Sequence, residues 1–248
     1  MLWLVVIAVL VWIALPFVPA VLEVYRRRDA APLALSNRYR EDLRLREDVA
    51  EDEVTVPAGE AVTGTASAGR VLRIGVGCSF ERLCAPAVRF GEAVAGGEAV
   101  AAARLPFEPP PHADEAAGRF LVRGDLTVPA RTLVEADLVV TGALRLEAAA
   151  VLRGSAKSHG PMNLGPEVEV QGSLFSKRDL YVGAGSRIAG VAAADGDLVL
   201  AQGSVVGTPE TGTTATGRRV YASAGSCVHG TVWALEAGRV TAAQRRHV

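Results

Sequence analysis

Residues 119–154 read RFLVRGDLTVPARTLVEA and then DLVVTGALRLEAAAVLRG, two 18-residue blocks that align without a gap. The interval continues along the chain as a glycine track, with Arg178 at one position of the track. An aliphatic track follows two residues behind it. The glycine track consists of Gly124, Gly142, Gly160 and Gly196, and the aliphatic track of Leu126, Leu144, Met162, Leu180 and Leu198.

A second glycine track runs beside the first and also keeps the 18-residue step until Gly207, which comes one residue early. Glycine at a corner permits a positive φ or a close approach of two backbones, which a Cβ would obstruct. We therefore assign the glycines of both tracks to turns. The predicted turn glycines are Gly124, Gly142, Gly154, Gly160, Gly172, Gly190 and Gly196.

Between the glycines, apolar and polar residues alternate over four-residue stretches such as Asp125-Leu126-Thr127-Val128. Strict alternation predicts short strands with one buried face. No window carries an apolar stripe of helical spacing over ten residues. The predicted core residues are Leu126, Val128, Leu144, Leu146, Leu180, Val182, Ile188, Leu198 and Leu200.

Repeats of this length cannot bury an apolar face alone, so each must stack on its neighbours, as in a solenoid. Eighteen residues suit one triangular turn of a β-helix, with three short strands, three corners and a rise of about 4.8 Å per turn. We predict an all-β fold of this kind. A β-sandwich with regularly spaced strands is the alternative fold.

The chain opens with an apolar run, Leu2 to Leu22, that contains no charged residue. At a rise of 1.5 Å per residue it reaches about 31 Å as a helix, which matches the roughly 30 Å hydrocarbon core of a bilayer. The run predicts one transmembrane helix ahead of the β-helix. The predicted anchor residues are Leu2, Trp3, Trp12, Phe17 and Leu22.

Three arginines, Arg26, Arg27 and Arg28, directly follow the run, and no basic residue precedes it. The positive-inside rule then predicts a single-pass protein of the inner membrane with its C-terminal domain in the cytoplasm. A cleaved signal peptide is the alternative, with Val18-Pro19-Ala20 as a cleavage site. The length of the run and the lack of basic residues before it oppose that reading.

The pattern divides the chain into six segments. We predict a transmembrane helix over 1–25, a charged juxtamembrane linker over 26–53 and β-rich turns over 54–103. The tetrapeptide Thr-Val-Pro-Ala at 55–58 recurs at 127–130, four repeats further on, so Val54, Leu72, Phe90 and Leu126 are expected in one core frame. A Pro-rich excursion over 104–118, the main β-helix over 119–240 and a tail over 241–248 complete the division. A separate small β domain over 54–103 is the alternative.

Composition and motifs favour a protein without a catalytic centre. A net charge of −1 and few aromatic residues oppose nucleic-acid binding. Three cysteines without disulfide spacing agree with a reducing compartment. We predict no catalytic, cofactor-binding or metal-binding residue and no small-molecule substrate, because four histidines lack zinc-ligand spacing and no phosphate-binding glycine motif follows a strand. These histidines are His112, His159, His229 and His247.

An N-terminal apolar anchor followed by stacked 18-residue units with the pattern Asp-Leu-x-Val, as at 179–182, resembles the bactofilins, which are polymer-forming bacterial cytoskeletal proteins. The resemblance covers mainly 119–240. It implies a right-handed β-helix that polymerises end to end without nucleotide, so that the partners would be further copies of the chain, the bilayer and cell-envelope proteins. The extra β-like material at 54–103 and the two polar or Pro-rich excursions depart from the family pattern.

Two other functions fit the same periodicity. Left-handed hexapeptide-repeat acyltransferases also have 18-residue turns, and Val182, Ile188, Ala194, Leu200 and Val206 follow a period of six. The Gly that accompanies each hydrophobic residue in that family occurs here only in patches. An exported β-solenoid that acts in envelope adhesion is the third hypothesis.

Overall fold

The computed structural model describes residues 3, 51–92, 104–111, 113–116 and 118–242 of the 248-residue chain. In this part of the chain, 23 strands join in one sheet. The sheet winds as a β-solenoid of about 10 turns with about 18 residues per turn. The predicted β-helical architecture and its 18-residue period are therefore confirmed.

The prediction that a transmembrane helix precedes the solenoid is corrected. Within the residues that the structure describes, no helix is long and apolar enough to cross a membrane, and the elements found there are strands. The chain divides into two units, Met1–Val49 and Ala50–Val248. Apart from Trp3, the segment assigned to the membrane, 1–25, lies outside the described residues, as does 26–50 of the predicted linker.

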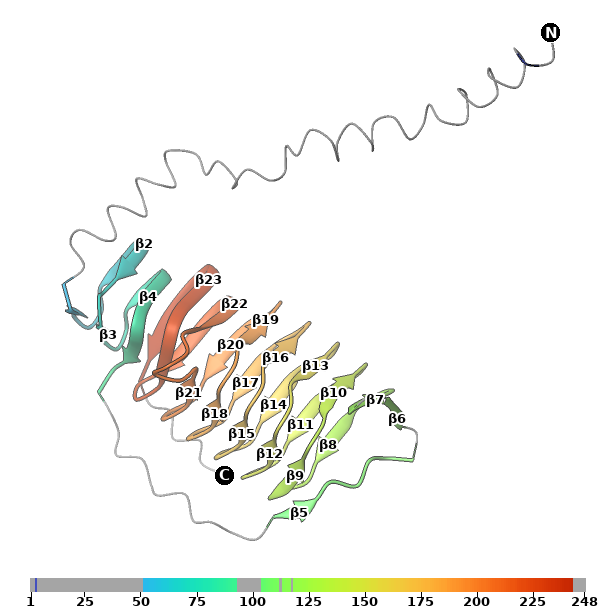
Figure 1. The fold of residues 1–248 in the computed structure, drawn as a ribbon. Coiled ribbons are helices and arrows are strands. Elements are labelled where there is room, and N and C mark those ends of the chain that lie inside the picture. Colours follow the sequence, from blue (N-terminus) through green and yellow to red (C-terminus); the bar gives the residue numbers. More distant parts are fainter. Residues whose placement is uncertain (1–2, 4–50, 93–103, 112, 117, 243–248) are drawn as a thin grey trace. The chain divides into compact units, whose positions relative to one another are not determined.

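The main column, residues 119–241, has three faces built from parallel strands (Figure 1). The first face comprises β7 (Arg119–Val122), β10 (Asp137–Val140), β13 (Ala156–Ser158), β16 (Leu174–Ser176) and β19 (Ala192–Ala194). The second comprises β8 (Leu126–Val128), β11 (Leu144–Leu146), β14 (Met162–Leu164), β17 (Leu180–Val182) and β20 (Asp197–Leu200). The third comprises β9 (Thr132–Val134), β12 (Val151–Leu152), β15 (Glu169–Val170), β18 (Arg187–Ile188) and β21 (Val205–Val206).

Strand alternation decides which side chains fill the column. In β8, β11 and β14 the first and third residues are buried and the middle residue is exposed. Leu144 pairs with Leu126 on one side and with Met162 on the other, so equivalent residues of successive repeats stack directly. The apolar interior is therefore continuous from turn to turn, as the sequence repeat predicts.

The corner between the second and third faces requires a left-handed backbone in every turn. The residues there have φ between 56° and 85°, although the first three of them carry a side chain. Non-glycine residues adopt this conformation at a cost of about 1–2 kcal/mol each. The corner residues are Arg131, Ala149, Glu167, Gly185, Gly203 and Gly225.

Other corners are held by polar side chains that bridge successive turns. Asp137 Oδ1 accepts a hydrogen bond from the Ser155 backbone N–H at 2.8 Å, and Ser155 Oγ accepts one from the Ser173 N–H at 3.1 Å. Ser173 Oγ in turn accepts from the Val191 N–H at 3.0 Å. At such a corner the backbones come so close that a Cβ on Gly172 would lie 2.5 Å from the Gly154 carbonyl oxygen.

The last two turns of the column are made largely of two long strands, β22 (Thr213–Ser223) and β23 (Cys227–Thr241), each of which bends around at least one corner. Leu198 pairs with Val220, so one turn has gained four residues. The addition is a loop over 208–212. The sequence predicts a longer polar excursion here, over 208–217, but residues 213–217 belong to β22 and pair with β19 and β23.

Residues 53–90 form further turns, here called the N-terminal turns. They comprise β1 (Glu53–Val56), β2 (Ala61–Ser67), β3 (Val71–Ile74) and β4 (Ser79–Phe90). Val54 pairs with Leu72, as the period predicts. The expected common frame then fails, because Leu72 pairs with Val88, two residues short of the period, and Phe90 pairs with Ile74.

The N-terminal turns do not lead into the first turn of the main column. Instead, β4 pairs antiparallel with β23, the last of the described strands (Figure 1). The two copies of the tetrapeptide Thr-Val-Pro-Ala therefore begin on different faces. The first begins in β1, which stacks through β3 and β4 on the start of β23 and so continues the third face. The second begins in β8, on the second face. An expectation based on register alone misses this reversal.

The Pro-rich segment places two short strands against the other end of the column. β5 (Leu105–Pro106) pairs parallel with β9, and β6 (Ala113–Ala116) pairs antiparallel with β7. Phe107 packs edge-on against Phe120 with ring centroids 5.8 Å apart. Part of the predicted excursion is therefore strand that covers the first turn.

Candidate functional site

The antiparallel pairing of β4 with β23, here called the seam, joins the N-terminal turns to the main column along all three faces. Cys227 lies opposite Arg89, Val232 opposite Leu83 and Gly238 opposite Phe80. Backbone bonds support the pairing, including Phe90 N–H to Ser226 O at 3.1 Å and Val240 N–H to Cys78 O at 2.9 Å. The seam thus joins the last strand of each set of turns.

Side chains from both strands of the seam close the apolar interior. The inward residues of β4 are Phe80, Leu83, Ala85, Val88 and Phe90, and those of β23 are Val228, Val232, Ala234 and Val240, all buried. The Phe80 and Phe90 rings pack with centroids 5.9 Å apart. Gly238 lies against the Phe80 ring, which a Cβ at this position would overlap. The interior therefore runs without a break across the reversal of strand direction.

The outer surface of the seam carries two specific side-chain contacts. The Arg82 guanidinium carbon lies 4.4 Å from the centroid of the Trp233 ring, a cation–π geometry. Next to it, Thr231 Oγ1 lies 3.6 Å from Cys84 Sγ, and these two residues are direct partners in the strand register. Trp233 remains 40% exposed.

Cys227 and His229 lie near the same seam on the third face. His229 Nδ1 is 3.1 Å from the Pro86 carbonyl oxygen of β4, so the ring donates from that nitrogen, and its Nε2 is 3.9 Å from Cys227 Sγ. Burial raises the pKa of the Cys227 thiol above its usual value, and the nearby Arg89 guanidinium partly opposes this. At neutral pH the thiol is therefore protonated and weakly nucleophilic.

One end of the solenoid presents strands that pair on one side only. Among the described strands, β1 pairs with β3 alone and β2 with β4 alone. The inward residues Val54, Val56 and Val62 pack against the core but stay partly exposed. An edge of this kind has unpaired backbone N–H and C=O groups beside an apolar surface.

The opposite end is more fully covered. In the described part of the chain β8 has β11 as its sole partner, yet Val128 is fully buried and Leu126 is 6% exposed. β7 and β9 pair with β6 and β5. The two ends of the solenoid are therefore unlike, because one shows partly exposed core residues and the other is covered in part by β5 and β6.

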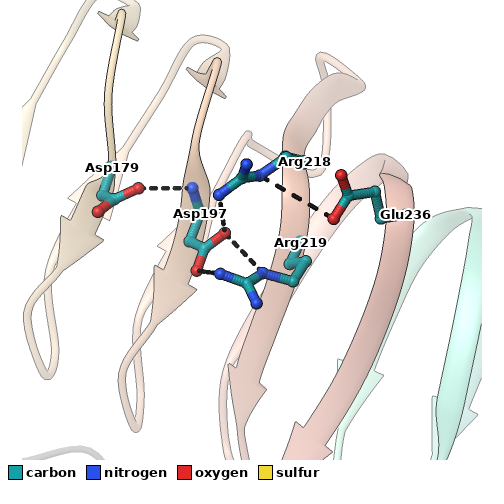
Figure 2. A network of polar contacts seen from close by, with 5 residues as sticks. All are labelled: Asp179, Asp197, Arg218, Arg219 and Glu236. Carbon is teal, nitrogen blue, oxygen red and sulfur yellow. Dashed lines mark hydrogen bonds and ion pairs between the residues drawn. The ribbon is translucent and has the colours of Figure 1, made fainter.

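A charged cluster lies on the second face close to the seam (Figure 2). Asp197 accepts two hydrogen bonds from Arg219, at 2.9 Å from Nε and 2.7 Å from Nη2. This contact raises the pKa of Arg219 above its usual value. Arg218 lies between the carboxylates of Asp197 and Glu236, at 3.8 and 4.0 Å, and Asp179 Oδ1 accepts from the Asp197 backbone N–H.

This cluster replaces a backbone bridge that the shorter turns make. Asp125 and Asp137 each accept from the backbone N–H of the residue that occupies the same position, 18 places later, in the next turn. Asp197 faces the longer turn, and its carboxylate binds the Arg219 side chain instead. The arrangement explains how the lengthened turn keeps its contact with the regular turn before it.

The structure places the predicted core residues together in the interior of the main column. Each is at most 6% exposed, namely Leu126, Val128, Leu144, Leu146, Leu180, Val182, Ile188, Leu198 and Leu200. The predicted turn glycines lie at corners, and Gly124 alone among them has a positive φ, of 90°. A Cβ at the others would overlap the preceding turn, as at Gly142, Gly154, Gly160, Gly172, Gly190 and Gly196.

Of the predicted anchor and topology residues, the structure describes only Trp3. Trp3 is 80% exposed. The others, Leu2, Trp12, Phe17, Leu22, Arg26, Arg27 and Arg28, lie outside the described residues, as do His112 and His247. Across the described ranges, no group of three His, Cys, Asp or Glu side chains could hold a metal ion.

The sequence alone does not identify the residues of the seam. The long strand β23 alternates buried and exposed residues over much of its length, as a strand should, but nothing in its sequence indicates a partner strand near the start of the β region. Comparison with protein-family models, curated proteins and solved structures gives no match to this chain. The function is therefore argued from the ends of the solenoid and the seam.

Proposed function

We propose that this protein is a structural scaffold that assembles with copies of itself through the end strands of its β-solenoid, without nucleotide. The observation that carries the proposal is the β1–β2 end, where Val54, Val56 and Val62 stay partly exposed beside an unpaired strand edge. Such an edge pairs with another strand unless it is blocked.

The seam supports this proposal, because it joins two sets of turns through their edge strands. At the seam two independently started sets of turns meet and bury the inner side chains of both strands. The same combination of backbone ladder and apolar interior is what an end-to-end contact between copies would use. The resemblance to bactofilins supports this reading, and the proposed family relation implies cell-envelope proteins as further partners.

Sedimentation and negative-stain microscopy of the purified full chain, at neutral pH without nucleotide, test the proposal. We expect elongated assemblies that pellet. A Val54→Glu variant should abolish them, because an inward charge at the edge blocks pairing. The matched control is Thr55→Glu, which changes the neighbouring exposed residue of β1 and should leave assembly intact.

Two outcomes would contradict the proposal. The wild-type chain would remain monomeric at every concentration, or both variants would assemble as well as the wild type. A uniform trimer with acyltransferase activity would instead favour the hexapeptide-repeat enzyme, the alternative that the 18-residue turn leaves open.

A further inference from the structure

The seam joins segments that the chain connects by a long route. On the third face, strand-to-strand contacts lead from β4 through β23, β21, β18, β15, β12 and β9 to β5, which makes seven steps. At about 4.8 Å per step, the ends of this path lie roughly 34 Å apart. Phe90 ends β4 at one end of the path, and Leu105 begins β5 at the other.

The connecting chain must span this distance when the seam closes within one molecule. Phe90 and Leu105 are fifteen positions apart (105 − 90), and a connection of that length can reach at most about 50–54 Å when fully extended. Closing the seam within one molecule thus requires about two thirds of the maximum reach, roughly 34 of 50–54 Å.

We propose that the seam is exchanged between copies, so that the N-terminal turns of one chain dock on β23 of the next. The contact is the one already described, and the only change is which chain supplies it, as in domain swapping. The inference rests on the proposed self-assembly and adds the seam to the β1–β2 end as a contact between copies.

Exchange shortens the distance that the connection between β4 and β5 must span, and it covers the β1–β2 end. If the main column follows directly behind its own N-terminal turns, the same connection crosses only the layers of β4, β3 and β1. Three steps of about 4.8 Å make roughly 14 Å. Each chain then offers one set of N-terminal turns and one acceptor strand, a heterologous contact that repeats along a line.

The pair Cys84 and Thr231 provides a direct test, because these residues are opposite one another at the seam with Sγ and Oγ1 3.6 Å apart. Two full-length chains with different tags are co-expressed, both with Cys227→Ser. One keeps Cys84 and Thr231. The other carries Cys84→Ala and Thr231→Cys, so that neither chain alone can form the 84–231 disulfide.

We expect a reducible heterodimer on non-reducing gels after mild oxidation. The matched control replaces Thr231→Cys by Thr127→Cys, which puts the thiol at an exposed position of β8, far along the column. Exchange places the two thiols opposite one another in the docked pair, so the Thr231→Cys pair should cross-link roughly tenfold more than the control.

A single chain with Cys227→Ser, Cys84 and Thr231→Cys reports whether the seam forms. If this chain links only within itself and the mixed chains give no more heterodimer than the control, exchange is overturned. Assemblies that pellet without the heterodimer would leave the proposed self-assembly standing and exclude the exchanged seam. If the single chain forms no 84–231 disulfide of either kind, the seam and the inference are both overturned.

Discussion

Val232 of β23 lies directly opposite Leu83 of β4, and both side chains are fully buried although they come from opposite ends of the β region of the sequence. Antiparallel pairing here interrupts a solenoid whose neighbouring turns are otherwise parallel, apart from the short β6 on β7. The apolar interior passes through this junction unchanged, so the seam should behave as part of the core.

Truncation of Leu83 tests whether the seam contributes to stability. Because the side chain is fully buried, Leu83→Ala should lower the free energy of unfolding by about 2–5 kcal/mol in urea denaturation. Leu235→Ala on β23 is the control, since Leu235 is 59% exposed and its truncation should cost no more than about 0.5 kcal/mol. Equal losses in the two variants would show that β4 does not pack on β23.

The sequence repeat predicts how successive turns stack, because each turn contacts the turns directly before and after it. Leu126, Leu144 and Met162 fill the same position in successive turns, so their regular spacing is sufficient to predict that they stack. The partners of the N-terminal turns are not periodic. Val54 and Leu72 fall in the same 18-residue series as Leu126. The strands nevertheless reverse direction at the seam, and no residue there indicates the reversal in the sequence.

The spacing of the glycines predicts some corners of the solenoid and misses another. Gly142 and Gly172 are needed because the backbones of adjacent turns touch there, and the spacing predicts both. The left-handed corner passes unnoticed, because Arg131, Ala149 and Glu167 occupy it in the first three turns. Backbone conformation at those positions is imposed by the turns stacked on either side, and the residue type does not reveal it.

At this left-handed corner, two substitutions should change the free energy of unfolding in opposite directions. Gly203 has a φ of 69°, and the nearest atom to a Cβ there would be 3.7 Å away, so Gly203→Ala should cost about 1–2 kcal/mol through backbone strain alone. Ala149, with a φ of 56°, already bears that strain. Ala149→Gly should therefore be neutral or stabilising by up to about 1 kcal/mol, after the added freedom of the unfolded chain is subtracted.

Thermal and urea unfolding measure these changes, with Ala148→Gly as the neighbouring control. Ala148 has no positive φ, so its replacement should destabilise by roughly 0.5–1 kcal/mol. If Ala149→Gly destabilised the protein as much as Ala148→Gly does, the corner would carry no strain.

The Asp197 cluster predicts a stability that depends on ionic strength. Asp197 binds Arg219 through two hydrogen bonds, and its side chain is 19% exposed. Asp197→Asn should lower the melting temperature at low salt and flatten its salt dependence, because roughly 1 M salt reduces the screening length to about 3 Å. Asp195→Asn changes an exposed neighbour and should do neither. Identical salt profiles for the wild type and Asp197→Asn would contradict a role for this pair.

Two buried serines in equivalent positions of successive turns should respond differently to the loss of their hydroxyl. Both Ser186 and Ser204 are fully buried. Ser186 Oγ accepts from the Val168 N–H at 3.0 Å and donates to the Gly165 carbonyl at 2.9 Å. Within the described residues, Ser204 Oγ is the buried side-chain oxygen that has no hydrogen-bond partner.

Ser186→Ala should reduce the free energy of unfolding by about 1–3 kcal/mol, because it leaves the Val168 N–H buried and unpaired. Ser204→Ala should be neutral or stabilising by up to about 1 kcal/mol, because it removes a polar group that is buried at a cost. Urea denaturation of both variants measures the difference, and the shared 18-residue frame keeps the steric change comparable. A loss of stability in Ser204→Ala as large as that in Ser186→Ala would mean that the Ser204 hydroxyl has a partner in solution.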